Sequence, residues 1–165
     1  MRHSRIHPNV NLHKVTTLRL PTTLDDLCPF CSTVPPGIVL QNLLFYARYD
    51  LYPVAKGHLL IIPFRHVVSF FELTGGERQA AFELVWEAKA KSDADFRPHG
   101  YNVGVNVGQA AGQTVSHVHI HLIPRYDGDM EHPEGGVRGV IPEKRIYQVV
   151  DHRSGGLCDG RVHSA

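Results

Sequence analysis

The sequence predicts an α+β domain in which an antiparallel meander of about five strands packs against one main helix. Strand-like runs occur on both sides of a single amphipathic helical stretch, and short turns rich in Gly, Pro and Asp connect them. A chain of 165 residues, 42% apolar and 20% charged, is ordinary for one globular domain. We expect that domain over residues 21–150, between polar or Gly-rich tails at 1–20 and 151–165.

The expected strands are short apolar runs. Residues 43–49 and 58–62 are rich in apolar and aromatic side chains, and turn-like residues separate them. Residues 101–107 alternate between apolar and small or polar side chains, which is the period of a strand. A further strand is expected over 115–123, after a Gly-containing turn.

The main helix is expected over residues 76–95. Thr74 and Glu77 have the spacing of a capping box, and apolar residues, Trp86 among them, then recur at helical intervals. Pro98 cannot continue a helix, so the element should end before it.

Charge and cysteine usage limit the possible partners. Seventeen Lys and Arg against sixteen Asp and Glu give a net charge of +1, which argues against a surface for long nucleic acid. The chain has no apolar run of the ~20 residues that a membrane span needs, and its first residues do not resemble a signal peptide. Three cysteines, of which two form a close pair, do not resemble a secreted disulfide framework. We expect a cytoplasmic protein that does not contact a membrane.

Three histidines alternate along the last predicted strand. Side chains on a strand alternate between faces, so His117, His119 and His121 should share one face while the apolar residues between them face the core. At ~3.3 Å of rise per residue the rings should lie about 6–7 Å apart. Polar filler on a wetted sheet, ligands converging on one zinc ion and catalysis by imidazole itself all remain open.

Cys28 and Cys31 have the two-residue gap that lets both thiolates reach one metal ion. A single pair needs two further ligands, so the pattern fits either half of a zinc site or two reduced cysteines packed near the core.

Taken together, these segments resemble the histidine-triad family. His-Val-His-Ile-His-Leu-Ile at 117–123 matches the family's His-x-His-x-His-x-x motif, and Ala-Gly-Gln-Thr-Val at 111–115 matches the segment before it. Lys-Gly-His-Leu-Leu-Ile-Ile-Pro at 56–63 and Asn106, eleven residues before the triad, also match. The resemblance covers about residues 28–125.

The resemblance implies a role for each histidine. The middle one, His119, would attack the phosphate of a nucleotide and become transiently nucleotidylated. An imidazole with its ordinary pKa of ~6.5 is largely unprotonated near neutral pH and is a competent nucleophile. His121 would donate a proton to the departing oxygen or stabilise its charge, and His58 would support the pair.

The resemblance also implies how a nucleotide would be held. The phosphoryl oxygens would meet the backbone of the Gly112 turn and the side chains of Gln113, Thr114 and Asn106. Asp50 matches a ribose-binding position, although a surface Asp in a turn would look the same. An apolar slot for the base could involve Phe30, Leu43 and Phe45, which the core would explain equally well.

In many bacterial members a matching cysteine pair binds zinc together with two histidines, which here are His66 and His117. The resemblance therefore implies a structural Cys₂His₂ zinc site, with Cys28 and Cys31, and no catalytic cofactor. In that case His117 leaves the chemistry to His119 and His121.

Residues 124–129 and 135–142 resemble bacterial relatives of the fragile-histidine-triad branch. The implied function is cleavage of dinucleoside polyphosphates, such as diadenosine tetraphosphate, at an α-phosphate. The cysteine pair departs from the eukaryotic members of that branch. Alternatives are a nucleoside phosphoramidase, a diadenosine tetraphosphate phosphorylase, a zinc hydrolase with its metal on His119 and His121, and a nucleotide-binding module without turnover. The family also implies a homodimer through the helix and an edge strand.

Overall fold

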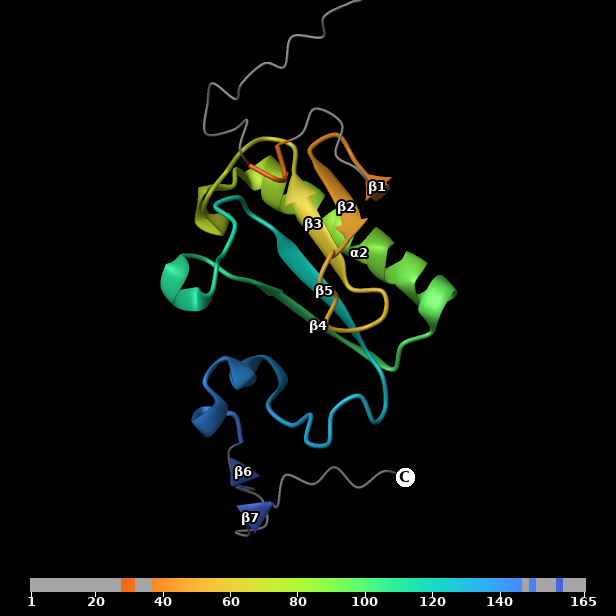
Figure 1. Cartoon of the computed structure of the whole chain (residues 1–165), viewed down its shortest axis with the longest axis vertical. Coiled ribbons are helices and arrows are strands. Elements are labelled where there is room, and N and C mark those ends of the chain that lie inside the picture. The colour runs from red at the N-terminus through yellow and green to blue at the C-terminus, as the bar shows by residue number, and fades with distance from the viewer. Residues whose placement is uncertain (1–27, 32–36, 147–148, 151–156, 159–165) are drawn as a thin grey trace, which may run out of the picture.

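The computed structural model describes residues 28–31, 37–146, 149–150 and 157–158. Three strands, β1 (Ile38–Gln41), β2 (Phe45–Tyr49) and β3 (Leu59–Pro63), precede the long helix α2 (Gly75–Phe96). Two more, β4 (Gly100–Val105) and β5 (Ile120–Arg125), follow it, and Figure 1 shows α2 crossing one face of the sheet. The expected tail 1–20 and most of 151–165 lie outside the described residues.

All neighbouring strands of the main sheet are antiparallel, in the order β1-β2-β3-β5-β4. The α+β prediction, with five strands and one packed helix, is therefore confirmed. After α2 the chain forms β4 at the edge of the sheet, and β5 then lies between β4 and β3. A small separate sheet pairs β6 (Val149–Val150) with β7 (Leu157–Cys158).

One face of the sheet and the helix form the core. Alternate residues of β2, β3 and β5 pack against α2, and the buried cluster includes Phe45, Leu59, Ile61, Leu84 and Leu122. Because successive strand residues face opposite ways, the residues between them form a second face. The register places Arg48 opposite Leu60, and Leu60 opposite His121, on that second face.

The helix begins where its capping box predicts. The Thr74 side chain accepts from the backbone N–H of Glu77, and the Glu77 carboxylate accepts from the backbone N–H of Thr74. Arg65 holds the same carboxylate through two hydrogen bonds of 2.8 and 2.9 Å, and lowers the pKa of Glu77 to about 2. At the other end Arg97 adopts the left-handed conformation, with φ of 51°, directly before Pro98.

The expected strand 115–123 begins later than the sequence pattern indicates. β5 starts at Ile120, and the segment from Val115 to His117 is bent, with the His117 N–H donating to the Val115 carbonyl at 2.8 Å. The cause is tertiary, because the His117 ring contacts the Pro63 carbonyl and two cysteines. Only His121 of the three triad histidines therefore lies within the strand.

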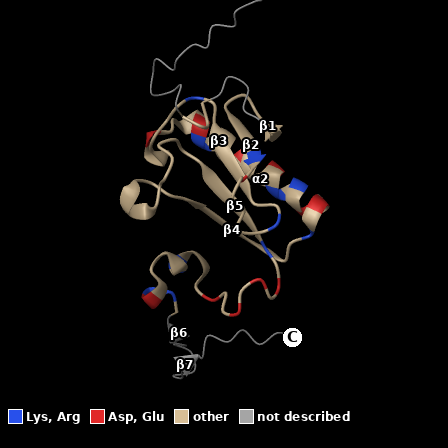
Figure 2. Ribbon diagram, in the orientation of Figure 1, with Lys and Arg blue, Asp and Glu red and all other residues tan. Residues whose placement is uncertain are grey.

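Apart from Arg48, charged side chains avoid the middle of the sheet. Figure 2 shows Lys, Arg, Asp and Glu along α2 and on the segment that follows β5. Within the five strands of the main sheet only Arg48 and Arg125 are charged, and Arg125 is the last residue of β5. Among the described residues, no helix combines the length and the hydropathy that crossing a bilayer requires.

Candidate active site and metal cluster

His58 and His121 form a hydrogen-bonded pair on the second face. His58 Nε2 lies 3.0 Å from His121 Nδ1; His58 directly precedes β3, and His121 lies in the neighbouring strand β5. The Val54 N–H donates to His58 Nδ1 at 3.4 Å, and a carboxylate oxygen of Asp50 lies 3.4 Å from the same nitrogen. Burial lowers the pKa of His58, although Asp50 opposes the shift, so this ring is neutral near pH 7.

The backbone defines the tautomer of His119. Its Nδ1 lies 2.8 Å from the carbonyl oxygen of His117, which can only accept a hydrogen bond. Nδ1 therefore carries the proton in the neutral ring, and Nε2 keeps its lone pair. The ring centroids of His119 and His121 are 5.0 Å apart, closer than the 6–7 Å expected for a regular strand.

His121 carries a buried nitrogen. Its Nε2 atom is inaccessible to solvent and makes no hydrogen bond with any described residue. Burial, together with the nearby His119 and His58, lowers the pKa of His121 to about 4. When His58 donates through Nε2, the neutral His121 ring carries its proton on Nε2, which is then a donor without a partner among the described residues.

A pocket of about 380 Å³ lies beside this pair. His58, His121, Asp50 and Asn106 contribute to its polar part. Apolar residues contribute the rest of the wall: Val54, Ile123, Val137 and Val140. Val137 and Val140 belong to the 3₁₀ helix Gly136–Val140, which packs against β4. The structure thus brings two expected catalytic residues, the expected ribose ligand and one expected phosphate ligand to a single cavity.

The turn before the triad is held by Gln113. Its side-chain oxygen accepts from the Gly108 N–H at 2.7 Å, and its amide donates to the carbonyls of Val68 at 2.8 Å and Val115 at 3.2 Å. Gly112 has a φ of 81°, which glycine adopts without strain. In this structure Gln113 shapes the loop, and Thr114 beside it is exposed.

The four expected metal ligands, of which His117 is one, lie close together. The ligand atoms of Cys28, Cys31, His66 and His117 all lie within 4.8 Å of one another. His117 Nδ1 is 3.4 Å from each sulfur, and His66 Nδ1 is 3.0 Å from that of Cys31. The structure thus brings together the four residues that the resemblance implied as metal ligands.

The donor chemistry of this cluster fits zinc. His117 Nε2 donates to the Pro63 carbonyl at 3.0 Å, so the Nδ1 lone pair faces the two sulfurs. A histidine ligand commonly gives its other N–H to a backbone carbonyl in this way. Bonds of ~2.3 Å to sulfur and ~2.0 Å to nitrogen in a tetrahedron would separate the ligand atoms by roughly 3.5 Å, close to the observed spacing.

The expected base slot is only partly present. Phe45 lies in the core on the helix side of the sheet, and Leu43 is exposed at the β1–β2 connection. Phe30 does reach the triad, with its ring centroid 5.8 Å from that of His117 and 5.4 Å from that of His119. Sequence reasoning missed Arg48, although a charged residue inside an apolar strand is a visible signal.

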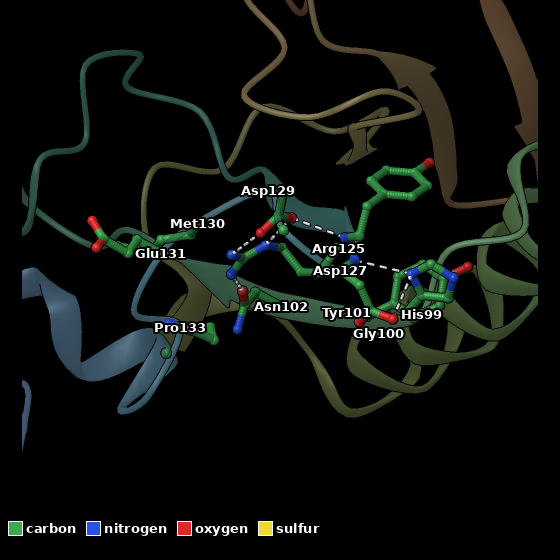
Figure 3. Close-up of a pocket in the computed structure, with 13 residues that line it drawn as sticks. His99, Gly100, Tyr101, Asn102, Arg125, Asp127, Asp129, Met130, Glu131 and Pro133 are labelled. Carbon is green, nitrogen blue, oxygen red and sulfur yellow. Dashed lines mark hydrogen bonds and ion pairs between the residues drawn. The ribbon is translucent and has the colours of Figure 1, made fainter. Parts of the chain in front are cut away.

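A second pocket of about 550 Å³ lies at the outer end of β4 and β5. In Figure 3 the Arg125 guanidinium lies between Asp129 and Asn102, and it donates to their oxygens at 2.6–2.8 Å. Arg125 is thus satisfied by its own neighbours, and this pocket contains none of the triad histidines.

The five-stranded antiparallel sheet with one packed helix, and the histidines gathered beside β3 and β5, define an α+β protein of the histidine-triad class. The HIT domain model matches residues 32–128, and the chain belongs to the HIT family.

Three curated relatives in this family carry different activities. An AP-4-A phosphorylase of Mycobacterium tuberculosis is 38% identical over 93 residues, 56% of this chain and 48% of the relative. The adenosine 5'-monophosphoramidase HNT1 of Saccharomyces cerevisiae is 34% identical over 128 residues, 74% and 78% of the two chains. An asymmetrical bis(5'-nucleosyl)-tetraphosphatase of Schizosaccharomyces pombe is 35% identical over 102 residues, 61% and 56%. The chain spans about half the length of the mycobacterial relative.

Solved structures agree with the fold. A HIT family member from Bacillus subtilis has a TM-score of 0.58 at 34% identity, covering 62% of this chain and 75% of that one. A zinc-bound histidine triad family protein from Mycobacterium smegmatis has a TM-score of 0.59 at 26% identity, covering 66% and 81%.

Proposed function

We propose that the chain cleaves dinucleoside polyphosphates, such as diadenosine tetraphosphate, at an α-phosphate through a nucleotidyl-His119 intermediate. The observation that carries this proposal is the hydrogen bond from His119 Nδ1 to the His117 carbonyl, because it leaves Nε2 as an unprotonated nucleophile. The relatives named for tetraphosphate cleavage support the substrate class.

The proposed cleavage has two steps, and side chains of this chain supply the nucleophile and the hydrogen-bond donor. His119 Nε2 attacks the α-phosphorus, and the bond from phosphorus to the bridging oxygen breaks. The departing oxygen takes the negative charge, and His121 Nε2–H stabilises it by a hydrogen bond. Because the pKa of His121 is near 4, this ring acts as a neutral donor rather than as an imidazolium acid. Water then attacks phosphorus, the P–N bond breaks, and AMP is released.

We further propose that Asn106, with Thr114 and the backbone N–H groups of the Gly112 turn, holds the phosphoryl oxygens, while the Gln113 side chain keeps this turn in place through its own hydrogen bonds. Asp50 binds the ribose hydroxyls from its position beside His58. If inorganic phosphate attacks in place of water, the product is ADP. The similarity to the mycobacterial phosphorylase makes this phosphorolysis the second candidate activity. The yeast relative makes a phosphoramidate the third substrate to assay.

We propose that Cys28, Cys31, His66 and His117 are the ligands of a structural zinc ion. When bound, it would supply a tetrahedral cross-link between the segment at 28–31 and the sheet. The donor geometry and the zinc-bound mycobacterial structure support the assignment. No step of the cleavage uses it.

A homodimer is also proposed. β4 is an edge strand of the sheet, and the exposed faces of Phe82 and Trp86 on α2 are 57% and 74% accessible. Pairing two β4 edges would join two sheets, and packing Phe82 and Trp86 against a second copy of the chain would bury apolar surface. Light scattering on the wild type and on Trp86→Glu tests this.

The decisive experiment incubates the protein with diadenosine tetraphosphate, with and without inorganic phosphate, and follows products by chromatography and protein mass. We expect AMP, and an adenylyl adduct that His119→Ala cannot form while it keeps the wild-type melting temperature. Turnover that survives in His119→Ala would disprove the nucleophile. Nucleotide binding without turnover on any of the three substrates would favour a binding module.

A further inference from the structure

Arg48 is a buried cation in the middle of the sheet. Only 7% of its surface is exposed, and it lies in β2 between residues that are buried or nearly so. The other four strands carry no charge except Arg125 at the terminal position of β5. A charge at such a position is costly unless something compensates it.

The compensation is absent among the described residues. The one hydrogen bond of the Arg48 side chain runs from Nε to the Tyr49 carbonyl at 3.5 Å, the outer limit for such a bond. Its guanidinium makes no ion pair with a described carboxylate, whereas Arg65 and Arg125 are each held by one. A guanidinium with unused donors is suited to bind a planar acceptor group.

The sheet register places Arg48 in line with the proposed chemistry. Arg48, Leu60 and His121 are directly opposite one another across β2, β3 and β5, on the same face. With ~4.8 Å between strands, the Arg48 and His121 Cα atoms are roughly 10 Å apart. Asp50, the proposed ribose ligand, follows Arg48 by two residues and contacts His58.

The direction of a bound nucleotide follows from these positions. Asn106, one of the proposed phosphate ligands, shares a pocket with His121, and Asp50 contacts His58 directly after the end of β2. Asp50 follows Arg48 by two residues, so the two side chains lie on the same face of the sheet. A base attached to a ribose at Asp50 would therefore be close to the Arg48 guanidinium.

We propose that Arg48 recognises the base and makes the site prefer guanosine to adenosine. Guanine presents two adjacent acceptors, O6 and N7, that match the two donors of a guanidinium. Adenine presents N7 beside an amino group, which is itself a donor and opposes the second guanidinium N–H. This inference rests on the proposed function and specifies its substrate.

The test compares GMP and AMP by calorimetric titration, and P1,P4-diguanosine with P1,P4-diadenosine tetraphosphate by turnover. We expect the wild type to bind GMP about tenfold more tightly than AMP, the scale of one bidentate contact. In Arg48→Met the ratio falls to about one, through a larger loss for GMP than for AMP. Arg48→Lys keeps the charge without the planar fork and loses most of the preference.

Two controls separate recognition from a structural role. Arg78→Met removes a cation from α2, on the opposite face of the sheet, and leaves the ratio unchanged. The melting temperature of Arg48→Met does not fall, because an apolar side chain replaces a buried charge that has no carboxylate partner.

Equal binding of GMP and AMP by the wild type would overturn the inference, as would a preference that persists in Arg48→Met. Cleavage of both tetraphosphates at equal rates would overturn it while leaving the proposed function intact. Failure to bind or cleave any nucleotide would overturn both.

Discussion

His58 Nε2 and His121 Nδ1 are separated by 3.0 Å, so the two rings form one hydrogen-bonded pair between the residue before β3 and strand β5. Through this contact the loop that ends in His58 determines which nitrogen of His121 carries a proton. The partner orients a ring whose other nitrogen is buried and without a partner.

Loss of the His58 contact should therefore lower turnover more than binding. We expect His58→Ala to reduce kcat by about 10-fold to 100-fold, the usual scale for a group that orients another ligand or catalyst. His58→Gln places an amide nitrogen near the position of Nε2 and should recover part of the loss. Steady-state kinetics with equal kcat for wild type and His58→Ala would contradict this role.

The pH dependence of stability should report the buried histidines. The folded pKa of His121 is about 4, below its ordinary 6.5, so the unfolded chain takes up a proton first as the pH falls. The stability from the neutral ring is present above pH 6.5 and is lost as the pH falls from 6.5 through 4. His58, whose pKa is also lowered, acts in the same direction.

Urea unfolding between pH 7 and pH 5 checks this. The wild type should lose stability across that interval, and His121→Asn, which cannot titrate there, should lose less. Identical slopes for the two proteins would show that His121 is not protected from protonation.

Metal content should follow the Cys/His cluster. We expect about one zinc per chain by elemental analysis, and Cys31→Ser should lose it together with a lower melting temperature, because metal binding stabilises the folded state. Cys158→Ser, which alters the cysteine in β7, is the matched control. Full zinc retention in Cys31→Ser would place the metal elsewhere.

The turn before His58 should tolerate no side chain at Gly57. Its φ is +82°, and an added Cβ would lie 2.6 Å from the Phe96 ring. Gly57→Ala should destabilise the fold by about 1–3 kcal/mol, from backbone strain and overpacking together. Gly76→Ala, near the start of α2 in open space, should be neutral or slightly stabilising. Equal unfolding free energies for the two variants would argue against the Phe96 contact.

Local patterns predicted the helix well, because its limits are determined locally. The Thr74–Glu77 box and Pro98 lie within the sequence window they delimit, and the observed helix exceeds the expected one by a single residue at each end. The start of β5 was not predictable in this way. It depends on His117 contacting Pro63, which is 54 residues away.

The candidate site likewise contains residues that the sequence indicated and residues whose role only the structure shows. Residue types and motif spacing indicated the histidines and the Cys/His ligands, which the structure brings into contact. Arg48 is visible in the sequence as a charged residue inside an apolar strand, but its burial is a property of the folded sheet that only the structure shows. The role of Val137 and Val140 as a pocket wall likewise arises from packing after the last strand.

That wall has a consequence for how the protein can be altered. Val137 and Val140 belong to a stretch outside the hydrogen-bonded sheet, while the histidines sit within or directly beside it. An insertion or shortening between Arg125 and Gly136 can therefore widen or narrow the cavity without shifting strand register. One part of the chain therefore determines the size of the molecule that the cavity admits, and another part carries the histidines that would act on that molecule.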